Sequence, residues 1–203
     1  VAELLGFDLE TGRLKSRHAF PPPRAVCNDM AVARDGRVYA ADTQNGRILR
    51  LDPGASELVV AADDAALKGI DGIEFAADGQ LYINLVTRGT VLRVSLTAQG
   101  RMDGLTELKL DDVLGGPDGM RLLEGNRFLL AEGTAGRIVE LRVDGDRGFV
   151  KVLRSGLQSS PGVTRVGNTA YAVEGKIGYL VDPKLRGQDP GEFRIIAIPL
   201  GSP

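Results

Sequence analysis

The sequence predicts an all-β fold in which a four-stranded antiparallel unit repeats around one axis. The first observation is a phrase that occurs four times: a polar or small residue, an apolar stretch, a Gly-centred turn and a second apolar stretch. The copies begin at Cys27, Ile70, Pro117 and Ser160, a period of about 42 to 47 residues. The second observation is another Gly-containing turn that keeps the same register in each copy. Short strands repeated at this period are typical of the blades of a β-propeller.

Each copy supplies the strands of one blade in order. A Gly-centred turn such as Asp35-Gly36 joins the first two strands, and the second Gly turn joins the second and third strands, because Gly adopts positive φ without steric cost. The third strands alternate apolar and charged residues, which suits half-buried strands. The outermost strands carry charges that protect a sheet edge. These fourth strands are expected at residues 58–60, 106–110, 149–153 and 193–197.

The repeats organise the chain as a single propeller domain, residues 1–203, with four full blades and a partial one. The partial blade is expected at residues 1–25 and the full blades at 26–67, 68–114, 115–158 and 159–203. A complete six-bladed ring requires roughly 270 residues at this period. We therefore interpret the chain as part of a six-bladed ring that lacks its leading blades. The alternative is a closed five-bladed ring in which residues 1–20 form a hybrid blade with the C-terminal strands.

Composition excludes several function classes. The chain is 43% apolar and 26% charged, with 27 Gly for its hairpins, as expected of a single soluble domain. The formal net charge of −2 gives no electrostatic case for nucleic acid. No apolar run approaches the roughly 18 residues of a membrane span. Cys27 is the one cysteine and cannot form an internal disulfide, so a periplasmic, extracellular or cytoplasmic location stays open.

Two sets of repeated positions direct acidic and amide side chains to one mouth of the channel. The first set precedes each innermost strand, and the second follows each second strand. Their members are Asn28, Asp29, Asp71 and Asp118 in the first set and Asp42, Asn84, Glu132 and Glu174 in the second. Crowded carboxylates repel one another, and hard oxygen ligands suit Ca²⁺ or another divalent cation such as Mg²⁺, Mn²⁺ or Zn²⁺. We therefore expect a cation site at this mouth, with Ca²⁺ foremost.

Simpler interpretations stand beside the cation site. Asp71 and Asp118 could cap loops, and Glu132 and Glu174 could be solvated acids on the rim. His18, the one histidine, lies on a polar outer strand and is expected at the surface, far from any Ser-His-Asp arrangement. Four Asp-Gly pairs between strands are expected to be ordinary turns, at Asp35, Asp78, Asp103 and Asp144.

The first and third copies resemble a known group of enzymes. Residues 28–32 (Asn-Asp-Met-Ala-Val), followed by residues 35–39 (Asp-Gly-Arg-Val-Tyr), resemble the gluconolactonase, regucalcin and luciferin-regenerating-enzyme group of six-bladed propellers. Residues 117–120 (Pro-Asp-Gly-Met) are similar to the most characteristic phrase of that group. The resemblance implies a divalent metal at the channel mouth. In that group the metal is held by a Glu from the leading blade, which has no counterpart in this chain, and by Asn and Asp from later blades.

The resemblance also assigns roles to individual residues. Asp118 matches the Asp ligand, and Asp71 lies where the group has an Asn ligand, which adds negative charge. Asn28 matches an Asn beside the metal that contacts substrate, so we count it as both a metal and a substrate-binding candidate. The substrate-contacting Arg of the group is replaced by Val26, and Arg24 is the nearby candidate for its role.

The resemblance therefore implies a metal-dependent hydrolase that opens a small-molecule lactone or related ester. In such an enzyme the metal polarises the carbonyl and a carboxylate activates water. Asp118 and, by its position, Glu132 are the candidate catalytic carboxylates, and Glu174 is a further substrate-binding candidate. The alternative is a non-enzymatic propeller that binds a small ligand, calcium or a protein partner, which the departures at Val26 and Asp71 favour.

Overall fold

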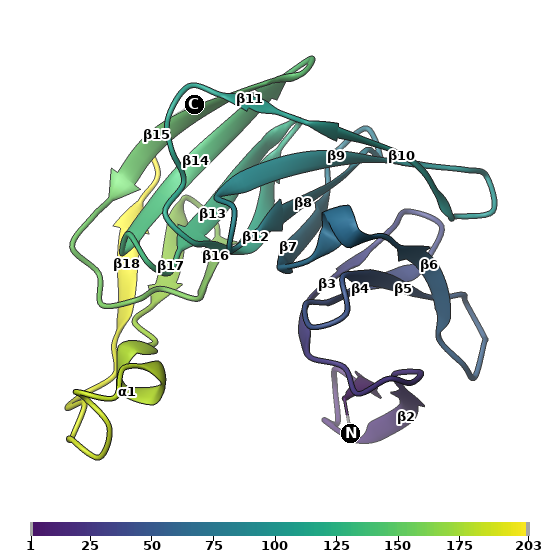
Figure 1. Ribbon diagram of the computed structural model, residues 1–203, viewed down its shortest axis with the longest axis horizontal. Helices are drawn as coiled ribbons and strands as arrows, with labels where there is room; N and C mark the ends of the chain where they lie inside the picture. Colours follow the sequence, from purple (N-terminus) through teal and green to yellow (C-terminus); the bar gives the residue numbers. More distant parts are fainter. Residues whose placement is uncertain (1, 202–203) are drawn as a thin grey trace.

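The computed structural model describes residues 2–201, which form a series of antiparallel sheets (Figure 1). The first blade consists of β3 (Cys27–Val32), β4 (Val38–Asp42), β5 (Arg47–Leu51) and β6 (Val59–Asp63). The second consists of β7 (Ile70–Phe75), β8 (Leu81–Leu85), β9 (Thr90–Leu96) and β10 (Met102–Glu107). The third consists of β12 (Pro117–Glu124), β13 (Arg127–Glu132), β14 (Arg137–Asp144) and β15 (Arg147–Arg154). The fourth consists of β16 (Gly162–Val166), β17 (Thr169–Val173) and β18 (Ile195–Pro199).

The remaining elements are short. β1 (Glu3–Phe7) and β2 (Leu14–Ala19) form a separate hairpin, and β11 (Lys109–Leu110) pairs in parallel with β15. The helices within residues 2–201 are the 3₁₀-helix η1 (Ala65–Leu67) and the single turn α1 (Gly178–Val181). The all-β prediction and the β-propeller arrangement are therefore confirmed.

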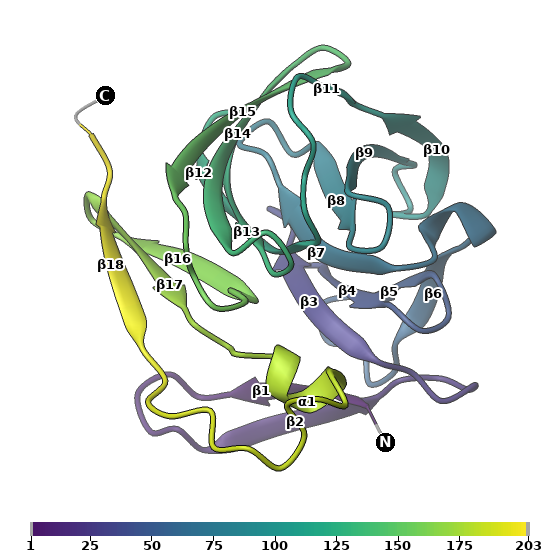
Figure 2. The ribbon, with the colours of Figure 1, turned by 60° about the vertical axis from the view of Figure 1, so that its left-hand side comes forward.

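The first strand of each blade is its innermost strand. β3 contacts β7, β7 contacts β12, and β12 contacts β16, so the four strands follow one another around the axis. Figure 2 shows the sheets extending outward from these strands. Equivalent positions of successive blades therefore lie side by side near the axis, which is the property that brings the site together.

The hydrophobic core is divided into layers between successive blades. Separate clusters join the first blade to the second, the second to the third and the third to the fourth. Two of these layers contain the same kind of aromatic contact: Tyr39 meets Phe75 edge-on at 5.4 Å between ring centroids, and Tyr82 meets Phe128 at 5.3 Å. Edge-to-face pairs of this kind stabilise beyond their buried area. Each blade is thus fixed to its neighbours rather than to one central core.

Two observations explain why the turn between the second and third strands contains Gly. Gly89 and Gly136 adopt φ of 65° and 60°, in the left-handed region. A Cβ at Gly89 would lie 2.4 Å from the carbonyl oxygen of Leu114, and one at Gly136 would lie 2.1 Å from that of Leu157. The turn therefore packs directly on the segment that enters the next blade, which explains why the repeat keeps it.

The fourth blade differs from the expected four strands. β18 pairs with β17 over Ile195–Pro199, so it is the third strand of its sheet rather than the fourth. The expected second Gly turn leads instead into α1. Residues 182–191 contain two Pro and two Gly among polar residues and lack the alternation of a strand. Within residues 2–201, no fourth strand pairs with β18.

The second blade contains two smaller departures. Asp103-Gly104, expected as a turn, lies inside β10, where the register with β9 shifts between Met102 and Gly104. The bulge allows the strand to continue through the Gly. The expected fourth strand at 106–110 is therefore wrong in its bounds: β10 ends at Glu107, and residues 109–110 pair with the third blade.

The N-terminal segment forms the expected hairpin and packs on the first blade through Leu4 and Phe20. Among the described residues, β18 pairs with β17 alone, so the structure contains no hybrid blade. His18 is buried, and its Nδ1 lies 2.9 Å from the carbonyl oxygen of Ser56, so its predicted surface position is wrong. No helix in the described part of the chain combines the length and apolar character needed to span a bilayer.

Candidate functional site

A β-bulge recurs at the same place in the innermost strand of three blades. The register between first and second strands shifts between Cys27 and Met30, between Ile70 and Ile73, and between Pro117 and Met120. A bulge inserts an extra residue and redirects the side chains beside it. The residues at the three bulges include Asn28, Asp71 and Asp118, the candidates that the repeat predicted to share the channel mouth.

Asn28 and Asp71 are joined directly. The Nδ2 of Asn28 donates to Oδ2 of Asp71 at 2.7 Å and to Oγ1 of Thr43 at 2.9 Å. The Thr43 hydroxyl donates to the carbonyl oxygen of Ile70 at 2.6 Å, so its oxygen is left to accept from Asn28. This arrangement fixes the amide with its NH₂ group toward Asp71.

Asp71 and Asp118 form a carboxyl pair. They occupy equal positions of adjacent bulges whose backbones are in close contact at Gly72, and Asp71 is only 5% exposed. Burial, followed by the charge of Asp118, raises the pKa of Asp71 to about 8, and burial raises the pKa of Asp118 to about 6. Near neutral pH the pair therefore holds a proton, because two adjacent carboxylates resist ionising together.

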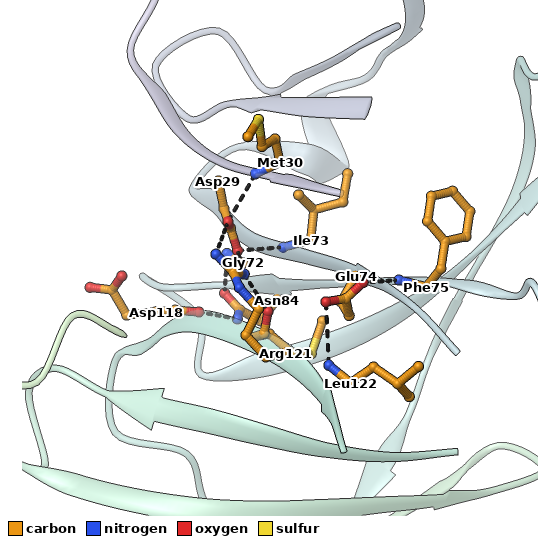
Figure 3. A network of polar contacts seen from close by, with 11 residues as sticks. Asp29, Met30, Gly72, Ile73, Glu74, Phe75, Asn84, Asp118, Arg121 and Leu122 are labelled. Carbon is orange, nitrogen blue, oxygen red and sulfur yellow. Dashed lines mark hydrogen bonds and ion pairs between the residues drawn. The ribbon is translucent and has the colours of Figure 1, made fainter. Parts of the chain in front are cut away.

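Asn84 holds the backbone beneath this pair (Figure 3). Its Oδ1 accepts from the N–H of Gly72 at 3.1 Å, and its Nδ2 donates to the carbonyl oxygen of Asp118 at 2.6 Å. A Cβ at Gly72 would lie 2.4 Å from both Asn84 Nδ2 and the Asp118 carbonyl oxygen. The Gly after Asp71 thus allows β7 and β12 to approach closely. Asn84, expected at the mouth, is instead a fully buried link between two bulges.

The other acids of the predicted rim are paired with arginines. Asp42 Oδ2 lies 2.7 Å from Arg47 Nη2, and Glu174 Oε2 lies 2.6 Å from Arg194 Nε. Glu132 accepts from Arg137 Nη2 at 2.9 Å.

Glu132 is also bound by the backbone N–H of Gly115 at 2.8 Å, and its side chain is fully buried. Neither Glu132 nor Glu174 shares a hydrogen bond with Asp71 or Asp118. Glu132 and Glu174 are thus bound to arginines rather than to the Asp71–Asp118 pair.

Sequence reasoning missed the arginines, although the repeat contains a signal for them. Asp42 lies directly opposite Arg47, and Glu132 directly opposite Arg137, across the second and third strands. The second blade has Leu85 and Thr90 at these positions, with neither acid nor arginine. In these three blades the acid and the arginine are therefore either both present or both absent, as expected of a cross-strand ion pair.

Arg24 is not connected to the cluster. Its backbone carbonyl accepts from Asn45 Nδ2 at 3.0 Å, and its side chain is exposed, with no hydrogen bond or ion pair to residues 2–201. The network below the cluster contains a second guanidinium that sequence reasoning did not identify. Arg121 of β12 binds Asp29 of β3, at distances of 2.8 and 2.9 Å (Figure 3). Asp29 occupies a repeat position that is Gly in the next two blades.

The donor atoms of the cluster fit a hard divalent cation in part. Asp71 and Asp118 lie at equal positions of adjacent bulges, where their carboxyl oxygens could act as neighbouring ligands of one ion. Asn28 turns its NH₂ group to Asp71, so its amide would have to rotate to offer oxygen. In residues 2–201, no three His, Cys, Asp or Glu side chains are grouped to hold a metal. The protein thus offers two carboxylates, with water required for the remaining positions.

Comparison with known proteins identifies solved structures with a similar fold. No family model matches the sequence, and no curated protein matches it. A virginiamycin B lyase from Staphylococcus aureus is 16% identical, with a TM-score of 0.66 over 84% of this chain and 55% of that one. A protein of the gluconolactonase family is 18% identical, with a TM-score of 0.63 over 79% and 60% of the two chains. Luciferin-regenerating enzyme is 13% identical, with a TM-score of 0.65 over 86% and 61%.

The chain thus spans about 55 to 61% of the length of these proteins. At such identities the likeness concerns the fold. The resemblance expected from residues 28–39 and 117–120 is confirmed for the fold. The chain is a β-propeller similar in structure to a gluconolactonase-family protein and to luciferin-regenerating enzyme.

Proposed function

We propose that this protein is a metal-dependent hydrolase that opens a lactone or related ester at the mouth formed by Asn28, Asp71 and Asp118. The observation that carries the proposal is the Asp71–Asp118 pair, two carboxyls held together by bulges in adjacent blades and left without an arginine. Every other acid of the predicted rim that we have described has such a partner. Like-charged groups kept together at a cost are typical of functional sites.

A divalent cation is the natural ligand of this pair. At neutral pH the pair retains a proton, and a cation would displace it, because ligating carboxylates must be deprotonated. When bound, the cation would polarise the substrate carbonyl and stabilise the oxyanion that develops there. Asp71 and Asp118 would hold it, and Asn28, fixed by Thr43, would keep the Asp71 carboxylate in place.

The base is assigned to Asp118, the more accessible member of the pair. Water adds to the carbonyl carbon and gives its proton to a carboxylate oxygen of Asp118, and the ring C–O bond then breaks. The proton passes to the leaving oxygen, so that the product is a hydroxy acid.

A cation-binding propeller without catalysis is the second candidate. It is favoured because Glu132 and Glu174, which could have supplied a separate base, are both bound to arginines. Asp118 alone would then have to bind the cation and accept the proton.

A lyase is less well supported. A catalytically inactive form of the similar virginiamycin B lyase has a histidine replaced by alanine. The one histidine of this chain, His18, is buried in the N-terminal hairpin next to Ser56 rather than at the mouth.

Calorimetry with Ca²⁺ and Mn²⁺, combined with pH-stat assays of glucono-δ-lactone and δ-valerolactone, tests the proposal. Asp118→Asn should lower cation affinity and hydrolysis together. Asp78→Asn, in a turn where Asp78 binds only the N–H of Gln80, should change neither. Cation binding without hydrolysis of any lactone or ester would favour the second candidate. Failure to bind any divalent cation would contradict both.

A further inference from the structure

The ion pair between Asp29 and Arg121 connects β3 of the first blade with β12 of the third (Figure 3). Nη1 of Arg121 lies 2.8 Å from Oδ2 of Asp29, and Nη2 lies 2.9 Å from Oδ1. Two parallel bonds between a guanidinium and a carboxylate fix orientation as well as distance. Oδ2 of Asp29 also accepts from the N–H of Ile73 at 3.3 Å. One buried carboxylate thus joins β3, β7 and β12.

This pair lies next to the candidate site in both strands. Asp29 directly follows Asn28, and Arg121 comes three residues after Asp118 on β12. Asn28 binds Asp71, and the N–H of Ile73, two residues after Asp71, binds Asp29, so the ion pair and the site share the β3–β7 contact. A change in the spacing of β3 and β12 would therefore change the position of Asn28 relative to Asp118.

The pair is an addition to the repeat rather than a part of it. The position of Asp29 is Gly72 and Gly119 in the next two blades, and the position of Arg121 is Ala31 and Glu74 in the two before it. Gly72 suffices between adjacent blades because β7 and β12 touch directly. The first and third blades are not adjacent, so long side chains are needed to connect them.

The surroundings of Arg121 single out Asp29 as its partner. Glu74, the other acid at this level, uses Oε1 to accept from the N–H of Phe75 at 2.9 Å and Oε2 to accept from that of Leu122 at 3.3 Å. The Asp29 side chain is 7% exposed, while that of Arg121 is 40% exposed. Without the guanidinium, Asp29 would be left as a buried, uncompensated charge.

We propose that Arg121 is a positioning residue for the channel mouth. It acts through Asp29 to set the separation of the first and third blades, and thereby the placement of Asn28 and Asp118 on either side of Asp71. Its effect on cation binding rests on the proposed function, whereas its effect on blade separation does not.

Blade separation is measured by pulsed electron paramagnetic resonance between nitroxide labels. The labels are placed at Gln44→Cys and Thr134→Cys, exposed turn positions of the first and third blades, in a Cys27→Ser background. Arg121→Gln and the double variant Asp29→Asn/Arg121→Gln should shift or broaden the distance distribution. The double variant removes the buried charge along with the ion pair, so it keeps the test valid if Arg121→Gln fails to fold.

Arg93→Gln is the matched control. Arg93 also links two blades, through Asp146 Oδ1 at 2.6 Å and the carbonyl oxygen of Gly145 at 3.0 Å, but from outer strands away from the channel. Its replacement should leave the distance distribution unchanged. If the Arg121 variants give the same distribution as the parent, the proposal is wrong.

Calorimetric titration with Ca²⁺ supplies the second readout. Loss of a group that orients metal ligands typically lowers metal affinity by roughly 10- to 100-fold, which we expect for both Arg121 variants. Arg121→Lys, which keeps the charge but loses the paired bonds, should fall between them and the parent. A broadened distribution with unchanged Ca²⁺ affinity would contradict the positioning role. If the parent binds no cation but the distribution still broadens, the proposed function fails and the positioning by Arg121 is supported.

Discussion

Two kinds of buried acid lie on the same face of this propeller. Asp42 and Glu132 end second strands, and each faces an arginine directly across the sheet. Asp71 and Asp118 lie at the start of first strands in adjacent blades, and the charge of Asp118 contributes to the raised pKa of Asp71. The first kind has its charge neutralised by a cross-strand partner. The second kind has a like-charged neighbour, and the pKa of both its members is raised.

This difference separates acids that support the blade from acids that a ligand could use. A buried carboxylate paired with arginine has its hydrogen-bonding capacity satisfied within the protein. A pair of carboxyls that shares a proton lowers stability whenever the proton leaves, and a cation can relieve that cost. In the sequence both kinds are simply acids next to an apolar strand, so the partner, rather than the acid, carries the information.

The largest effect is expected from breaking an arginine pair. Arg47→Met should lower the free energy of unfolding by about 3–5 kcal/mol, because it leaves the fully buried Asp42 without a counterion. Urea denaturation followed by circular dichroism measures the change. The double variant Asp42→Leu/Arg47→Thr copies Leu85 and Thr90 of the second blade and should regain at least part of the loss. Equal destabilisation in the two variants would show that the pair does not act as a unit.

The next effect concerns the cation. Ca²⁺ at a hundred times its dissociation constant should raise the free energy of unfolding by about 2.7 kcal/mol. Asp71→Asn should lose this response, since one of the two carboxylates is gone. Glu132→Gln should keep it, although the variant starts from a lower stability. Differential scanning calorimetry with and without Ca²⁺ provides the measurement, and a response abolished by Glu132→Gln would remove the distinction between the two kinds of acid.

An effect of similar size is expected in the pH dependence of stability. Because the pKa of Asp71 is raised from 3.8 to about 8, the folded state holds a proton that the unfolded state has released. The resulting stability is fully present below about pH 4 and is lost as the pH rises through 8, by up to about 1.4 kcal/mol per unit. Asp71→Asn should flatten this decline and be the more stable form at pH 8. Urea unfolding from pH 5 to 8 tests this, with Asp78→Asn expected to follow the parent.

The repeat was sufficient to predict the blades and the three residues that lead them. Asn28, Asp71 and Asp118 occupy equal positions, and a propeller brings equal positions of adjacent blades together. The same reasoning failed in the fourth blade. Its copy of the repeat has the expected length, but residues 182–191 within it lack the alternation of a strand. Periodicity predicts pairing only where the alternation of apolar residues continues.

The remaining features of the site depend on contacts that a repeat does not encode. The bulges are shifts of register between strands, and the sequence shows only the Gly that accompanies them in the second and third blades. The ion pair of Asp29 and Arg121 joins residues 92 positions apart in blades that are not adjacent. The proton of the Asp71–Asp118 pair follows from burial and distance, which are properties of the folded chain.

The smallest effect is expected from an ion pair that is exposed to solvent. Arg88 Nη2 lies 2.7 Å from Glu107 Oε2, the same distance as in the Arg47–Asp42 pair. The side chains of Arg88 and Glu107 are 49% and 50% exposed, against 5% and 0% for Arg47 and Asp42. Arg88→Gln should therefore change the free energy of unfolding by less than about 1 kcal/mol, because water and salt screen an exposed pair. Urea denaturation beside Arg47→Met measures both under one condition, and a loss at Arg88 comparable to that at Arg47 would show that distance, and not burial, governs the worth of these pairs.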